Sequence, residues 1–103
     1  MKRAVVWSHP ASRDFLKLTT YISTDSPDAA LRVGAAITQT AAKLGTRLTG
    51  RPGRLARVFE KSVPKLPYII AYEIAAKGDE EIVVILQVVH SARNWPKGAW
   101  PES

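Results

Sequence analysis

The stretch LTTYISTDSPDAALRVGAAI, residues 18–37, predicts two helices separated by a short break. Apolar residues recur at helical spacing before the break and again after it. Within the break, Ser26 offers a hydroxyl cap, Pro27 suits the first helical position, and Asp28 places an acid near the positive end of the helix dipole. Because the break is short, we expect the helices to fold back as an antiparallel hairpin. The two apolar stripes are Ala11, Phe15, Leu18 and Ile22, then Ala30, Val33, Ile37, Ala41 and Leu44.

Four segments outside this hairpin have the composition of β-strands. Residues 3–7 precede the helices, and residues 55–63, 68–75 and 82–89 follow a loop rich in glycine, residues 45–54. The last of these segments is almost entirely apolar and β-branched, which predicts a central strand covered on both faces. The element order β-α-α-β-β-β predicts an α+β fold with a small, antiparallel-rich sheet and the helical hairpin on one face. A chain of 103 residues supports one hydrophobic core, so we expect one domain spanning residues 1–103.

The positive charge of the chain is concentrated in one segment. The net charge is +6, and the segment from Lys43 to Lys65 contains seven basic residues against a single acid, Glu60. The rest of the chain is balanced, with eight basic and eight acidic residues. A segment of one sign predicts an acidic or polyanionic partner, with a solvated basic face as the alternative. The seven basic residues are Lys43, Arg47, Arg51, Arg54, Arg57, Lys61 and Lys65.

The composition gives no indication of a metal or cofactor. There is no cysteine, which excludes a disulfide or a thiolate metal site and fits a reducing compartment. The two histidines do not have the spacing of a zinc site. No apolar run is long enough to cross a membrane, and the N-terminal residues do not read as a signal peptide. We therefore expect a cytoplasmic protein without a cofactor.

Four motifs together resemble the RelE/ParE toxin superfamily. They are the hairpin quoted above, the basic loop GRPGR at residues 50–54, the strand PYIIAYEI at residues 67–74, and VVHSARNWP at residues 88–96. They occur in the order found in that superfamily and cover most of the chain. The resemblance implies a curled sheet carrying two helices. It also implies the toxin of a bacterial type II toxin–antitoxin pair, forming a hetero-oligomer with an antitoxin that neutralises it.

The resemblance implies two possible mechanisms. ParE-like members poison DNA gyrase, whereas RelE-like members are metal-independent endoribonucleases that cut mRNA on the ribosome. Ile69 follows Tyr68 where similar RelE-like enzymes carry an arginine, which favours the ParE-like branch. Where many relatives have Gly-Thr-Arg-Glu, this chain has RVFE, residues 57–60. We expect Arg57 to supply the missing cation from the same strand face as Phe59. If the chain is an endoribonuclease, the catalytic candidates are His90, Arg93, Arg57 and Lys61.

The end of the last strand has an aromatic and cationic composition. We predict that His90 packs on Trp95 and is not an essential catalytic base, and that Trp95 plugs the open end of the sheet. Stacking of Trp95 on nucleic-acid bases is the alternative, and a non-toxic, basic nucleic-acid-binding module is the third possible function. We expect the antitoxin to cover the basic segment and the apolar edge of the hairpin. The residues expected to bind the target or antitoxin are Arg47, Arg51, Arg54, Arg57, Lys61, Lys65, Arg93 and Trp95.

Overall fold

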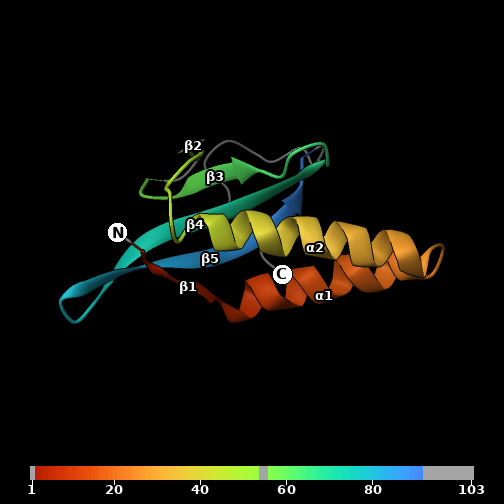
Figure 1. Ribbon diagram of the computed structural model, residues 1–103, viewed down its shortest axis with the longest axis horizontal. Helices are drawn as coiled ribbons and strands as arrows, with labels where there is room; N and C mark the ends of the chain where they lie inside the picture. The colour runs from red at the N-terminus through yellow and green to blue at the C-terminus, as the bar shows by residue number, and fades with distance from the viewer. Residues whose placement is uncertain (1, 54–55, 92–103) are drawn as a thin grey trace.

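The computed structural model describes residues 2–53 and 56–91, which form a five-stranded sheet with two helices on one face (Figure 1). Sheet and helices together make the α+β fold expected from the sequence. The elements in chain order are β1 Ala4–Trp7, α1 His9–Ser23, α2 Pro27–Lys43, β2 Arg51–Pro52, β3 Phe59–Ser62, β4 Tyr68–Lys77 and β5 Glu80–His90.

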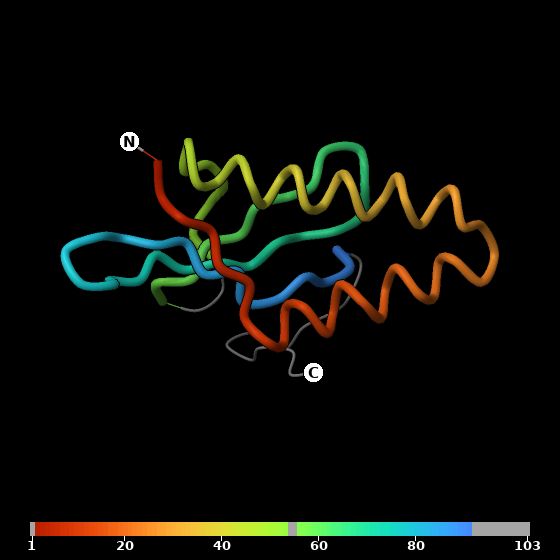
Figure 2. Tube along the Cα trace, turned by 60° about the horizontal axis from the view of Figure 1, so that its bottom comes forward, coloured from red at the N-terminus to blue at the C-terminus, as the bar shows by residue number. Residues whose placement is uncertain are grey.

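Each helix begins at a serine cap followed by a proline. The Ser8 side chain accepts a hydrogen bond from the backbone N–H of Ala11, and the Ser26 side chain accepts one from Ala29. These bonds satisfy N–H groups that a helix start leaves without a partner. The restart at Ser26 is therefore confirmed, and Ser8 is the first cap. The helices lie antiparallel and extend past the sheet (Figure 2).

The sheet has the order β1-β5-β4-β3-β2. The contact between β1 and β5 is parallel, and the remaining contacts are antiparallel. The β4–β5 register shifts between Ala71 and Tyr72, where β5 has one extra residue, Leu86. The segment predicted to be a central strand becomes β5, which is flanked by β1 and β4. Its buried residues meet the helices in a core whose fully buried larger side chains are Ile37, Leu44, Ile70, Ile85, Val63 and Val83.

The region between α2 and β4 differs from the prediction. The strand expected over residues 55–63 is confined to Phe59–Ser62, and the preceding loop contains the short strand β2. The backbone N–H of Gly53 donates to the carbonyl of Val58 at 2.6 Å, which closes a tight β2–β3 hairpin. Arg57 lies in the turn of this hairpin with a φ of 66°. The prediction that Arg57 shares a strand face with Phe59 is therefore wrong, because Arg57 precedes the strand.

Candidate functional site

Four described cations of the basic segment lie along one edge of the sheet. Arg51 is in β2, Lys61 is in β3, and Arg57 and Lys65 occupy the turns at opposite ends of β3. Arg47 lies in the loop between α2 and β2. All of these side chains are exposed except Lys61, which is half-buried. Four of the predicted cations therefore form an extended edge, called here the basic edge: Arg51, Arg57, Lys61 and Lys65. Lys43 ends α2, and Arg47 lies in the turn that follows it.

Two turns of this edge have a left-handed backbone at a residue with a side chain. Arg57 and Lys65 have φ values of 66° and 65°. This conformation costs about 1 kcal/mol or more for a residue that is not glycine, so the surrounding hairpin and turn must hold it in place. Its effect is to direct two exposed basic side chains outward from the two ends of β3.

The single acid of the basic segment is buried. Glu60 is 4% exposed, and its carboxylate lies 3.5 Å from the guanidinium of Arg51 on the neighbouring strand. The second carboxylate oxygen, Oε2, has no hydrogen-bond partner among the described residues. A buried carboxylate needs compensation, so part of the charge of Arg51 is committed to Glu60 rather than to a partner.

A buried tyrosine forms a hydrogen bond to the loop that precedes β2. The Tyr72 hydroxyl donates to the backbone carbonyl of Thr49 at 2.6 Å, and its ring stacks on Phe59 with 5.5 Å between ring centroids. Burial raises the pKa of the Tyr72 phenol above its ordinary value of 10.0. The phenol therefore remains a neutral donor over the range in which proteins fold.

The catalytic candidates do not converge on one point. His90 lies opposite Tyr68 at one end of β4, while Phe59 lies opposite Tyr72. Four residues along a strand span about 13 Å, and crossing two strands adds a separation of about 10 Å. Arg57 lies beyond Phe59, farther still from His90. Acid–base catalysis needs its groups within about 3 Å of the reacting atoms, so His90 and Arg57 do not form one catalytic site.

Among the described residues, the ring of His90 has an aromatic neighbour. Its ring packs edge-on against Tyr68, with 5.5 Å between ring centroids and an interplanar angle of 77°. Ile69, at the position expected to be arginine in a RelE-like enzyme, is buried opposite Val89. Of the described cations among the candidates, Lys61 is the nearer to His90 in register, since it pairs with Ile70, but it is two strands away. The predicted contact of His90 with Trp95, like Arg54 and Arg93, lies outside the described residues.

A second surface lies on the helical hairpin, where the two helices enclose an apolar groove of about 550 Å³. The Thr19 and Thr38 hydroxyls in it donate back to the carbonyls of Phe15 and Gly34 in their own helices, at 2.9 and 3.0 Å. These bonds leave methyl groups and hydrocarbon facing the groove. Within residues 2–53 and 56–91, no charged side chain lines it. The lining residues are Phe15, Thr19, Thr20, Ser23, Pro27, Ala30, Leu31, Gly34, Ala35 and Thr38.

Small residues and an exposed leucine shape this groove. A Cβ atom added at Gly34 would lie 3.3 Å from Cζ of Phe15, so the missing side chain lets α1 and α2 approach closely. Leu31, on the rim, is 74% exposed. A large exposed apolar side chain beside an apolar groove is typical of a protein-binding surface.

Comparison with known proteins identifies the family. The sequence model of the family described as "ParE toxin of type II toxin-antitoxin system, parDE" matches residues 5–95. The chain belongs to the ParE toxin family. A protein named "Putative toxin Y4kP" from Sinorhizobium fredii (strain NBRC 101917 / NGR234) is 36% identical over 97 residues, which cover 93% of this chain and 96% of that protein.

The fold of this ParE-family chain is also found in a solved structure. A chain of the "Chromosomal ParDE TA system from P. aeruginosa" superposes with a TM-score of 0.75 over 86% of this chain and 96% of that chain, at 18% sequence identity. The family is a toxin family of type II systems, in which a ParE toxin is paired with an antitoxin. This confirms the resemblance inferred from the sequence motifs.

The sequence analysis of this ParE toxin missed two features of the site. It treated Glu60 as a retained motif residue and did not predict its burial against Arg51. It expected the edge of the hairpin to be apolar but did not predict the groove between the helices. The alanines and Gly34 of α2 are the sequence signal of close helix approach.

Among the described residues, no group of three or more histidine, aspartate or glutamate side chains could hold a metal ion. Neither described helix is long and apolar enough to cross a membrane.

Proposed function

We propose that this ParE-family toxin arrests growth in the cytoplasm by binding DNA gyrase and that it carries out no RNA cleavage of its own. The observation that carries this proposal is the separation of His90, at the end of β5, from Arg57, in the turn before β3. An RNase would need a base, an acid and cations around one phosphate. The family's gyrase-directed activity needs a binding surface instead. The cations of the basic edge are spread along the sheet edge and are not gathered around one point.

The cognate antitoxin binds through two different surfaces in this proposal. The groove between α1 and α2 is apolar and uncharged, so it suits the apolar face of an amphipathic helix. The basic edge suits an acidic segment of the same antitoxin. Arg51, Arg57 and Lys65 are its exposed cations, and the charge of Arg51 is partly neutralised by Glu60.

Expression of the chain without an antitoxin tests the proposal. We expect growth arrest, with cellular mRNA intact, and relief of the arrest when the cognate antitoxin is co-expressed. The variant His90→Gln should arrest growth as the parent chain does, because the imidazole transfers no proton. Loss of toxicity in a folded His90→Gln chain that still binds the antitoxin would favour the endoribonuclease alternative.

A further inference from the structure

The solvent side of α1 carries hydrogen-bond donors. Seven residues of this helix are exposed, and six of their side chains have an N–H or O–H group, Leu16 being the exception. None of the seven is acidic. A surface of donors favours a partner rich in acceptors. The six residues are called here the donor face: His9, Ser12, Arg13, Lys17, Thr20 and Tyr21.

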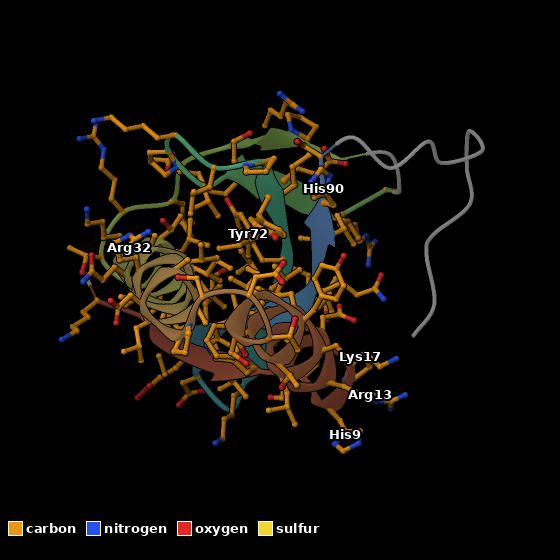
Figure 3. All side chains as sticks on the ribbon, turned by 90° about the vertical axis from the view of Figure 1, so that its right-hand side faces the viewer. His9, Arg13, Lys17, Arg32, Tyr72 and His90 are labelled. Atoms are coloured by element: carbon orange, nitrogen blue, oxygen red, sulfur yellow. The ribbon has the colours of Figure 1, made fainter. Side chains whose placement is uncertain are left out.

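Four residues of the donor face form one row along the helix. His9, Arg13 and Lys17 follow at intervals of four residues and point to the same side of the molecule (Figure 3). Tyr21 comes four residues later and is 76% exposed. Four residues of an α-helix rise about 6 Å, so the row presents its groups at this regular spacing.

The acid of α1 is directed away from this face. Asp14 is the one acid in the sequence of the helix. Its carboxylate accepts a hydrogen bond from the backbone N–H of Val88 at 3.1 Å and is thus directed toward β5. The first turn of α1 contains no acid. The charge of Arg13 and Lys17 is therefore not balanced by an acid on the same face of their helix.

Neither the core nor the groove accounts for the donor face. The residues that α1 packs on the core include Ala11, Phe15 and Leu18, on the other side of the helix. Of the donor face, Thr20 alone belongs to the groove lining. A partner of the donor face would therefore approach α1 from a different side than an occupant of the groove.

The spacing and the residue types suit a nucleic-acid backbone. Each strand of duplex DNA carries one phosphate per about 3.4 Å of helix axis, so every second phosphate lies about 7 Å farther along. This distance is close to the spacing of the row. Arginine, lysine, serine, threonine and tyrosine side chains are all donors that contact phosphates. Such contacts need charge and donors and do not need an apolar pocket, which matches the composition of the donor face.

We propose that the donor face of α1 binds the sugar–phosphate backbone of the DNA duplex that gyrase holds. The inference rests on the proposed gyrase-directed function and adds a DNA contact to it. Arg13 and Lys17 neutralise phosphates, and the hydroxyl groups donate hydrogen bonds to phosphate oxygens. Contacts of this kind position a protein on the duplex without reading its sequence.

The salt dependence of DNA binding tests the donor face. Fluorescence anisotropy measures the affinity of the chain for a labelled duplex of mixed sequence between about 50 and about 200 mM salt. Each phosphate contact adds about 0.9 to the slope of log affinity against log salt. Lys17→Gln and Arg13→Gln should therefore each make the slope shallower by about one.

The matched control is Arg32→Gln, which removes the same charge from α2 on the other side of the molecule (Figure 3). It should leave the slope unchanged. Circular dichroism checks the fold of each variant, and Lys17→Gln decides the test if Arg13→Gln does not fold. Equal slopes for the Lys17→Gln and Arg32→Gln chains would overturn the inference.

A second measurement identifies the source of the DNA. The affinity of the chain for gyrase is compared with and without a bound duplex. The duplex should strengthen binding of the parent and of Arg32→Gln, and for Lys17→Gln this gain should be smaller by about fivefold at about 0.1 M salt. An equal gain in all three chains would show that the gyrase-held duplex does not contact this face. A loss for Lys17→Gln on gyrase without DNA would instead place an acidic protein surface there.

The outcomes separate this inference from the proposed function. If the parent chain inhibits supercoiling but Lys17→Gln matches Arg32→Gln in both measurements, the inference is wrong and the gyrase-directed function stands. If the parent chain neither binds nor inhibits gyrase, the proposed function and the gyrase-held duplex as partner both fail.

Discussion

The guanidinium of Arg51 lies 3.5 Å from the carboxylate of Glu60, and the two side chains differ sharply in exposure, at 65% and 4%. They come from adjacent strands that pair directly, Arg51 opposite Glu60. The pair therefore joins the short strand β2 to the rest of the sheet. It also partly neutralises the charge that Arg51 presents to a partner.

Replacing Arg51 by alanine should destabilise the fold. The change leaves the buried Glu60 carboxylate without its cation, although the exposure of Arg51 limits the effect to about 1 kcal/mol in the free energy of unfolding. Urea unfolding measures the change. In the background Glu60→Gln the same Arg51→Ala substitution should cost much less, and additive costs in this double-mutant cycle would show that the two side chains are not coupled.

Replacing Tyr72 by phenylalanine should cost about 1 kcal/mol, because the hydrogen bond to the Thr49 carbonyl is lost. Burial raises the pKa of Tyr72, so the native state holds the phenolic proton more tightly than the unfolded chain does. Its contribution to stability is therefore complete below the ordinary pKa of 10.0 and is lost as pH rises through the raised value. Urea unfolding at about pH 8 and about pH 11 measures this loss.

The matched control for Tyr72 is Tyr21→Phe, since Tyr21 is 76% exposed. The parent chain and Tyr21→Phe should lose stability similarly at alkaline pH, whereas Tyr72→Phe should lose less. An alkaline loss of the same size in all three chains would contradict the assignment to Tyr72.

The groove between the helices should bind the antitoxin through Leu31. Leu31→Glu places a carboxylate on an apolar contact and should weaken antitoxin affinity by at least about tenfold, which is about 1.4 kcal/mol. The free chain should change in stability by less than about 0.5 kcal/mol, because Leu31 is exposed. Gln39→Glu makes a charge change on the exposed surface of the same helix, outside the groove, and should leave affinity unchanged. Equal effects of the two variants would contradict a specific groove contact.

The basic edge should act mainly on the rate of antitoxin association. Arg57→Gln should slow association a few-fold at low salt with little change in dissociation, because exposed charges steer the encounter more than they hold the complex. Lys77→Gln removes a charge of the same sign at the end of β4, away from the basic edge, and serves as the control. Surface plasmon resonance separates the two rates. A change confined to dissociation would show that Arg57 acts by a buried contact instead.

The helical hairpin could be predicted from the sequence because its determinants are local. Ser26, Pro27 and Asp28 act within one helical turn, and the capping bond from Ala29 to Ser26 is the contact that such a sequence predicts. The apolar run of β5 likewise identified a strand with neighbours on both sides. The parallel pairing of β1 with β5 joins segments almost eighty residues apart, so no local pattern specifies its register.

The sequence predicts that basic residues cluster in this segment, but it does not predict where their side chains lie in the fold. Residues 55–63 have the composition of a strand, although neither face is purely apolar, and this composition predicts a longer strand than the one observed. The hairpin bond from Gly53 to Val58 and the left-handed Arg57 delay the start of that strand to Phe59, and both depend on tertiary packing. The burial of Glu60 is a consequence of the same register, because Arg51 becomes its neighbour only when β2 pairs with β3.

The central claim, that the toxin binds gyrase and cleaves no RNA, is tested most directly by a supercoiling assay. Purified gyrase, relaxed plasmid and ATP are incubated with the chain, alone or preloaded with its antitoxin. The account predicts inhibition of supercoiling by the free chain, equal inhibition by His90→Gln, and none by the chain bound to antitoxin. Undiminished supercoiling in the presence of the free chain, together with cleavage of mRNA when the same preparation is added to a translating extract, would contradict it.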